Sequence, residues 1–169
     1  VINAKVSVLK IEGRGRAPEY VATVTKVYRE AIDSIENHTY NPEKIKSWML
    51  ELEKVYNRGF WSGYYLGQQL GEWTNQSGSS ATQKKIYIGK STHYYSKSQI
   101  GVFQIDAGSI KEGDSIYIIG PTTGVVESVI EEIRIENQSV QEAQKGDLCS
   151  FKVPCLVRNS DKLYKIVSS

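Results

Sequence analysis

Residues 6–33 read VSVLKIEGRGRAPEYVATVTKVYREAID, and this stretch says more about the architecture than any other part of the chain. Its first six residues are mostly apolar and β-branched, which is typical of a strand buried on both faces in a parallel sheet. Glycines at positions 13 and 15 allow a sharp turn. Pro18 suits the first turn of a helix. The pattern predicts a strand over residues 6–11, a charged turn and then a helix.

One strand of this kind is not stable alone, because a parallel strand needs neighbours on both sides. No second strand–helix–strand pattern follows downstream. We therefore expect the chain to begin in the middle of a larger protein. We also expect residues 1–12 to be disordered or to pair with another copy as a homodimer, since an unpaired strand edge invites such pairing.

A polar stretch over residues 72–84 is the predicted linker between two domains. Residues 1–71 hold the strand and helix described above and a second helix from about Pro42 to Tyr56, which follows an Asn-Pro start signal. Residues 85–169 contain short β-branched runs separated by Gly-Asp and Gly-Pro turns. The predicted fold class is α+β: a remnant strand and helices from the end of an α/β, barrel-like domain, followed by a small closed antiparallel β-barrel.

The longest of these β runs is Val125–Glu136, in which Val129-Ile130 interrupts the alternation and predicts a bulge or bend. Two turns share a pattern, Ile110-x-x-Gly-Asp and Ala143-x-x-Gly-Asp, and Gly-Val-Val-x-x-x-Ile lies between them. This order resembles the second-domain barrel of translational GTPases, which implies a binding or packing module.

The run LKIEGR at residues 9–14, with the Tyr-Val-Ala-Thr-Val helix behind it, closely resembles the collagenase-like peptidases of family 32 in the unclassified (U) group. The segment from Asn57 to Gly67 resembles another block of that family. The turn departs in its second half, because the family usually has Glu-Gly-Arg-Met-Lys-Ser where this chain has Glu-Gly-Arg-Gly-Arg-Ala over residues 12–17.

The resemblance implies that the parent protein is an enzyme, either a peptidase or one of the family members that act in prephenate-dependent hydroxylation of tRNA or ribosomal RNA. Some relatives carry an iron–sulfur cluster on cysteines upstream of the Glu-Gly-Arg turn, and those positions are absent here. We therefore expect no cofactor in this chain and a possible cluster only in the missing part. The partners implied for the full-length protein are a peptide or protein substrate or a structured RNA.

Composition narrows the class of protein. The 169 residues are 40% hydrophobic and 24% charged, which is ordinary for a soluble domain. No apolar run approaches the roughly 18 residues that span a bilayer, so we expect no membrane partner. Residues 1–71 hold 10 Lys and Arg against 8 Asp and Glu, and residues 72–169 hold 11 of each. A dedicated binder of duplex nucleic acid would show a basic excess.

Two isolated cysteines, Cys149 and Cys155, fit a reducing compartment, and we expect a cytoplasmic protein. They have no further ligands at metal-site spacing, so no metal centre is predicted. Cys149 is expected to point into the β core beside Phe151. The two histidines, His38 and His93, have no convincing nucleophile partner in the sequence.

The charged turn holds the candidate site residues. Glu12 and Arg14 are the candidate catalytic residues, and Lys10, Arg14 and Arg16 are candidates for binding a carboxylate or phosphate ahead of a helix N-terminus. The alternative is an ion-pair network that only closes the sheet.

A second candidate surface is aromatic and comprises Phe60, Trp61, Tyr64 and Tyr65. These side chains are suited to stacking on bases or gripping a peptide. Alternatively, they cement the helices.

Three hypotheses about function follow. The chain is the C-terminal part of a collagenase-like peptidase, with the barrel as an accessory module that binds or positions substrate. Alternatively, it belongs to an RNA hydroxylation protein whose barrel positions RNA, or it is a structural interaction domain.

Overall fold

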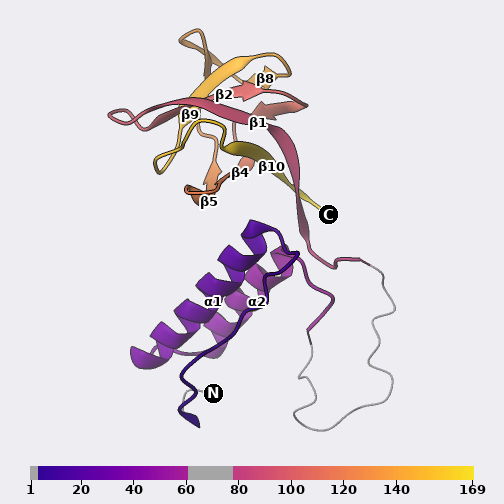
Figure 1. Cartoon of the computed structure of the whole chain (residues 1–169), viewed down its shortest axis with the longest axis vertical. Helices are drawn as coiled ribbons and strands as arrows, with labels where there is room; N and C mark the ends of the chain where they lie inside the picture. Colours follow the sequence, from indigo (N-terminus) through magenta and orange to yellow (C-terminus); the bar gives the residue numbers. More distant parts are fainter. Residues whose placement is uncertain (1–3, 61–77) are drawn as a thin grey trace. The chain divides into compact units, whose positions relative to one another are not determined.

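The structure is a computed structural model that describes residues 4–60 and 78–169. The chain divides into two compact units, Val1–Gln83 together with Ser169, and Lys84–Ser168. The first unit is helical and the second consists of β-strands (Figure 1). This content confirms the predicted α+β class. Of the predicted linker over residues 72–84, residues 72–77 lie outside the described residues, and the first strand begins at Gln83.

The helical unit is built on two helices that lie side by side, α1 (Pro18–Glu36) and α2 (Pro42–Lys54) (Figure 1). Each begins with a proline, which lacks the N–H that a first-turn residue leaves unpaired. Asn41 caps α2, because its Oδ1 accepts a hydrogen bond from the backbone N of Lys44 at 2.9 Å. Helix α2 ends two residues before the predicted Tyr56, since Val55 is extended.

Few side chains hold the two helices together. Val24 and Val27 of α1 are buried, and Trp48 of α2 donates from Nε1 to Glu30 Oε2 of α1 at 3.0 Å. Ser34 is also buried, and its Oγ donates to the carbonyl of Ala31 at 2.8 Å. A larger set of apolar side chains in this unit is exposed, including Val21, Tyr28, Ile35, Ile45 and Leu50.

The predicted strand over residues 6–11 is wrong. Residues 6–13 form neither helix nor strand, and Val6 and Val8 are 50% and 79% exposed. The physical reason is the lack of a partner strand. A strand is stabilised by backbone hydrogen bonds to its neighbours, and the described residues offer this segment none. An apolar, β-branched composition was therefore not enough to make these residues a strand.

The β unit contains ten strands. Eight form one sheet in the order β5-β4-β10-β1-β2-β9-β6-β7, and β3 pairs with β8 in a separate two-stranded sheet. The pairs whose registers are defined are antiparallel. The strands are β1 (Gln83–Tyr95), β2 (Ile100–Ile105), β3 (Ser109–Lys111), β4 (Ser115–Gly120), β5 (Gly124–Val129), β6 (Ile133–Ile135), β7 (Gln138–Val140), β8 (Glu142–Gln144), β9 (Leu148–Lys152) and β10 (Lys162–Ser168).

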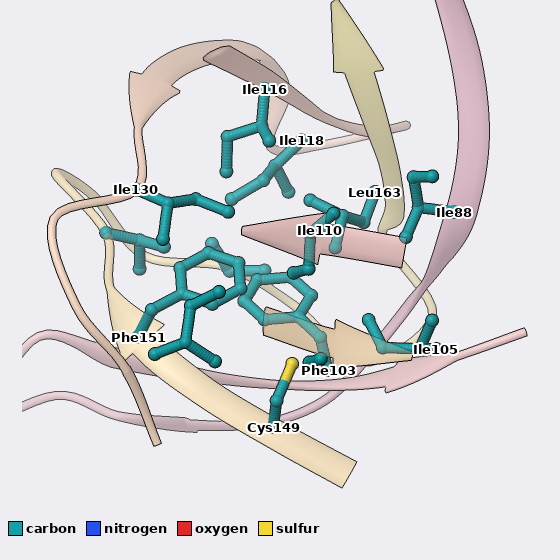
Figure 2. Close-up of a cluster of buried hydrophobic side chains, with 14 residues drawn as sticks. Ile88, Phe103, Ile105, Ile110, Ile116, Ile118, Ile130, Cys149, Phe151 and Leu163 are labelled. Atoms are coloured by element: carbon teal, nitrogen blue, oxygen red, sulfur yellow. The ribbon is translucent and has the colours of Figure 1, made fainter. Parts of the chain in front are cut away.

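A single hydrophobic core fills the β unit, and Figure 2 shows its side chains converging from both sheets. Phe103 of β2 and Phe151 of β9 stack with ring centroids 4.5 Å apart. Cys149 is buried in the same cluster, which confirms the prediction that it points inward beside Phe151. The other members are Ile88, Ile105, Ile110, Ile116, Ile118, Ile130, Ile133, Ala143, Val153, Val157 and Leu163.

The sheet is not a closed barrel, so that part of the prediction is wrong. Its edges are β5 and β7, which do not pair with each other. Residues Val125–Glu136, which were predicted as one strand, also differ from the prediction. The chain leaves the ladder after Val129, buries Ile130 and resumes as β6 near the opposite edge. The predicted bend at Val129-Ile130 is therefore a complete break between two strands.

The two Gly-Asp turns form matching corners. Each leads from the two-stranded sheet to the eight-stranded sheet, between β3 and β4 and between β8 and β9. Gly113 and Gly146 have φ angles of 85° and 101°, which glycine adopts without strain. Asp114 Oδ2 accepts a hydrogen bond from the backbone N of Lys111 at 2.9 Å. Asp147 Oδ2 accepts one from the backbone N of Gln144 at 2.7 Å.

A third turn uses the same design next to β10. Asp161 Oδ2 accepts from the backbone N of Arg158 at 2.8 Å, and Ser160 has a φ of 71° where the other turns have glycine. This aspartate is buried, and Thr123 Oγ1 also donates to its Oδ2 at 2.6 Å. The carboxylate therefore ties the β4–β5 turn to the start of β10, close against Gly120.

Candidate functional site

The charged turn ahead of α1 is held by its own atoms. The backbone N of Arg14 donates to Glu12 Oε1 at 2.8 Å, and the backbone N of Arg16 donates to the carbonyl of Gly13 at 3.0 Å. A Cβ on Gly13 would lie 2.8 Å from Val21 Cγ2, so the turn packs closely on α1. The Glu12 carboxylate thus shapes the turn.

The structure does not gather the four charged side chains of this turn into one cluster. Lys10, Glu12, Arg14 and Arg16 are exposed. In the described part of the chain, no hydrogen bond or ion pair joins two of these four side chains, and the bond from Arg14 to Glu12 comes from the Arg14 backbone N. Arg16 instead reaches a residue that follows α2.

That residue is Tyr56, whose side chain contacts the guanidinium groups of both Arg16 and Arg58. The Cζ of Arg16 lies 3.8 Å from the centroid of the Tyr56 ring, in a cation–π arrangement. From the other side in sequence, Arg58 Nε donates to Tyr56 Oη at 2.8 Å. Desolvation raises the pKa of the Tyr56 phenol, but hydrogen bonding to Arg16 and Arg58 and their positive charges outweigh it, so the pKa lies below its ordinary value.

A groove of about 360 Å³ lies beside these three side chains, within the helical unit. Arg16, Tyr56 and Arg58 stand along it, and its remaining walls are mostly apolar or aromatic. Neither Arg16 nor Arg58 is ion-paired with a carboxylate among residues 4–60 and 78–169. We call this site the Arg16–Arg58 groove; among residues 4–60 and 78–169, its other lining residues are Tyr20, Val24, Tyr28, Leu52, Val55, Asn57, Gly59 and Phe60.

Asn57 fixes the backbone on one side of the Arg16–Arg58 groove. Its Nδ2 donates to the carbonyl of Val55 at 3.0 Å, and its Oδ1 accepts from the backbone N of Gly59 at 3.1 Å. Its own carbonyl accepts from the backbone N of Ser80 at 2.8 Å. Both ends of the Asn57 amide are therefore used internally and hold the segment that presents Arg58.

Only part of the predicted aromatic surface can be placed. Phe60 lines the Arg16–Arg58 groove and is 49% exposed. Trp61, Tyr64 and Tyr65 lie outside the described residues. Sequence reasoning missed Tyr56, because the helical spacing of α2 assigned it to a packed helix face. The sequence does show that Tyr56 lies two residues before Arg58 and just after the charged last turn of α2, which would have pointed to this pair.

The β unit carries a second exposed aromatic group, which the sequence analysis also missed. Tyr87 of β1 and Tyr164 of β10 meet edge to face at 5.7 Å, and Lys85 Nζ lies 4.8 Å from the Tyr164 ring centroid. Tyr87 Oη donates to Asp106 Oδ2 at 2.7 Å, and this hydrogen bond raises the pKa of Tyr87 to about 12. We call Lys85, Tyr87 and Tyr164 the tyrosine cluster.

The cysteines and histidines form no catalytic constellation in the described residues. Burial raises the pKa of the Cys149 thiol to about 12, so it is no nucleophile near neutral pH. His93 packs edge to face on Tyr95 at 4.5 Å, and His38 lies in the turn after α1 with a φ of 56°. No group of three or more His, Cys, Asp or Glu in the described part of the chain is placed to hold a metal ion.

No helix among the described residues is both long enough and apolar enough to cross a membrane.

Comparison with known proteins shows which family the helical unit resembles. The model of peptidase family U32 matches residues 1–75. Over that part of its length the chain resembles this family. The U32 match includes the charged turn, both helices and every residue of the Arg16–Arg58 groove. It ends before the first strand of the β unit.

Two curated relatives are similar to nearly the whole chain. A collagenase of Porphyromonas gingivalis is 52% identical over 165 residues, which cover 98% of this chain and 40% of that protein. A tRNA hydroxylation protein of Bacillus subtilis is 29% identical over 172 residues, covering 98% of this chain and 39% of that protein. The chain thus spans about two fifths of the length of these relatives.

Among solved structures, the C-terminal domain of a Geobacillus thermoleovorans protein assigned to the U32 peptidases is similar to this chain. The TM-score is 0.45 at 22% identity, and the match covers 47% of this chain and 90% of that domain. The predicted likeness of the β unit to translational GTPases stays a prediction.

Proposed function

We propose that this chain is the C-terminal part of a collagenase-like peptidase and that it binds and positions the peptide substrate. The observation that carries the proposal is the 52% identity to the Porphyromonas gingivalis collagenase, which extends through both units.

The tyrosine cluster supports a binding role for the β unit. Collagen-like peptides are rich in proline and extended, and such chains dock on exposed aromatic side chains that pack against the proline rings. Tyr87 is 37% exposed, and its ring is held by Tyr164 and Asp106. A fixed aromatic side chain loses little conformational entropy when a ligand binds.

The test is binding of gelatin to the purified chain, with Tyr87→Ala compared against Tyr95→Ala. Both tyrosines lie on β1, but Tyr95 is outside the tyrosine cluster and 54% exposed. We expect gelatin binding that weakens about tenfold in Tyr87→Ala and stays unchanged in Tyr95→Ala. Absence of gelatin binding by the wild-type chain would overturn the proposal.

A second candidate is a part of an RNA hydroxylation protein, favoured by the match to the Bacillus subtilis tRNA hydroxylation protein over 98% of this chain. Its test is tRNA binding across a salt series, because phosphate contacts make affinity fall steeply with salt. Tight, salt-dependent tRNA binding without gelatin binding would select this candidate. Binding to neither would leave a structural interaction domain.

We further propose that residues 1–169 alone cleave no peptide. Incubation with a fluorogenic collagen-like peptide should give no turnover above buffer. Turnover that disappears in Glu12→Gln or Arg14→Gln would contradict this and would assign catalysis to the charged turn.

A further inference from the structure

We propose that the Arg16–Arg58 groove binds the free C-terminal carboxylate of a peptide, with the two arginines holding the carboxylate and the apolar walls holding the last side chain. The inference rests on the proposed function, since it names the end of a peptide chain as the group that the helical unit recognises. It adds a site and a ligand chemistry to the binding role.

The first argument is charge. Two guanidinium groups contact the same Tyr56 side chain, one on its ring and one on its hydroxyl. Neither is neutralised by a carboxylate in the described part of the chain. Like charges held close together repel, and an anion between them relieves that repulsion. Guanidinium groups bind carboxylates through paired, charge-assisted hydrogen bonds, which makes a carboxylate a fitting anion.

The second argument is how the arginines are held. Arg16 comes from the turn before α1 and Arg58 from the segment after α2, so the two helices must pack for the pair to form. Tyr56 restrains both side chains, and Asn57 fixes the backbone beside Arg58. Ordering two arginines in advance lowers the entropic cost of binding a ligand.

The third argument is the lining. Val24, Leu52 and Val55 are aliphatic, and Tyr20, Tyr28 and Phe60 add aromatic surface. An inorganic phosphate would gain nothing from such walls, whereas an apolar side chain attached to a carboxylate would be transferred out of water. A volume of about 360 Å³ is ample for one large side chain.

A nucleotide is disfavoured by the same lining. Reading a base edge requires hydrogen-bonding groups with free capacity. Asn57 carries the one side-chain amide among the described lining residues, and it already uses its Nδ2 and Oδ1 on backbone groups. The Asn57 amide therefore offers a base edge no free hydrogen-bonding group, and titration with adenosine monophosphate tests whether the two arginines bind a nucleotide instead.

The experiment is calorimetric titration of the 169-residue chain with N-acetyl-Gly-Pro-Leu bearing a free carboxylate. The matched probe is the same tripeptide as its C-terminal amide, which lacks only the charge. We expect the acid to bind at least about tenfold more tightly than the amide. Inorganic phosphate and adenosine monophosphate are further arms, and we expect both to bind more weakly than the acid.

The variants are Arg16→Gln and Arg58→Gln, with Arg29→Gln as the control. Arg29 lies on α1 outside the groove and is paired with Asp33 at 2.6 Å. We expect each groove variant to weaken the acid about tenfold and to leave the amide unchanged. Arg29→Gln should change neither. Circular dichroism of each variant verifies that the helices remain folded.

Equal affinity for acid and amide would overturn the inference, as would unchanged acid binding in both groove variants. Tighter binding of adenosine monophosphate than of the acid would also overturn it, in favour of a nucleotide site. Failure here is distinguishable from failure of the proposed function, because gelatin binding is measured through Tyr87 on the β unit. A chain that binds gelatin but does not distinguish acid from amide refutes only the present inference.

Discussion

Replacing Gly120 by alanine should destabilise the β unit strongly, because the new methyl group would overlap a buried carboxylate. A Cβ at this position falls on Asp161 Oδ1 and Cγ. The Asp161 carboxylate cannot move aside freely, since its Oδ2 accepts from Thr123 Oγ1 at 2.6 Å and from the backbone N of Arg158 at 2.8 Å. Moving it breaks both hydrogen bonds inside the protein.

Hydrogen bonds to a charged group contribute about 1.5 to 3 kcal/mol each. Losing both predicts a fall in the free energy of unfolding of about 3 to 6 kcal/mol. Gly124, at the other end of the same turn, provides the control. Its φ is 75° and nothing lies within 4 Å of its added Cβ, so Gly124→Ala should cost only about 1 kcal/mol of backbone strain.

The assay is urea unfolding followed by far-ultraviolet circular dichroism. Tryptophan fluorescence would not serve, because the three tryptophans, at positions 48, 61 and 73, precede the β unit. Combining Gly120→Ala with Asp161→Ala completes a double-mutant cycle, and without the carboxylate the glycine change should cost less than about 1 kcal/mol. If Gly120→Ala is no more costly than Gly124→Ala, the reasoning is refuted.

Three further predictions concern single groups. Iodoacetamide at about pH 8 should alkylate Cys155 and spare Cys149, because a pKa of about 12 leaves only ~10⁻⁴ of the Cys149 thiol ionised; equal labelling rates by mass spectrometry would contradict this. The pKa of Tyr87 is raised above 10.0 to about 12, so its hydrogen bond stabilises the fold below pH 10 and that stabilisation is lost as the pH rises towards 12. Asp106→Asn should return the pKa towards 10 in an NMR titration of labelled tyrosine, and an unchanged pKa would remove Asp106 as the cause. Asn41→Ala should lower the stability of the helical unit by about 1 kcal/mol, measured by tryptophan fluorescence in urea, and an unchanged midpoint would argue against the cap.

Local signals in the sequence were sufficient for much of the fold. Pro18 and the Asn41-Pro42 pair mark where the helices begin, because proline and asparagine act through the first turn alone. The Gly-Asp turns could be predicted equally well, since each depends on four consecutive residues: a glycine that adopts a positive φ and an aspartate whose carboxylate accepts a backbone hydrogen bond. The inward position of Cys149 followed from strand alternation.

The errors concern interactions between distant residues. Residues 6–11 have strand composition but no partner in the described chain, and composition does not reveal the partner. The break after Val129 depends on where β5 and β6 find their neighbours, at opposite ends of the sheet. The Arg16–Arg58 groove was not predicted, and the naming of Arg16 as an anion ligand stays a prediction. The meeting of Arg16 with Tyr56 requires the packing of α1 on α2, which periodicity does not specify.

The matching Gly-Asp corners have a consequence for the order of folding. Strands β3 and β8 pair through Ile110 and Ala143, yet each is continuous, through its corner, with a strand of the larger sheet. The small sheet therefore closes only after both corners have turned, and its six residues bridge two halves of the unit that are distant in the chain. Amide hydrogens of β3 and β8 should exchange together and only on global opening, which would make this short ladder the reporter of cooperativity for the whole β unit.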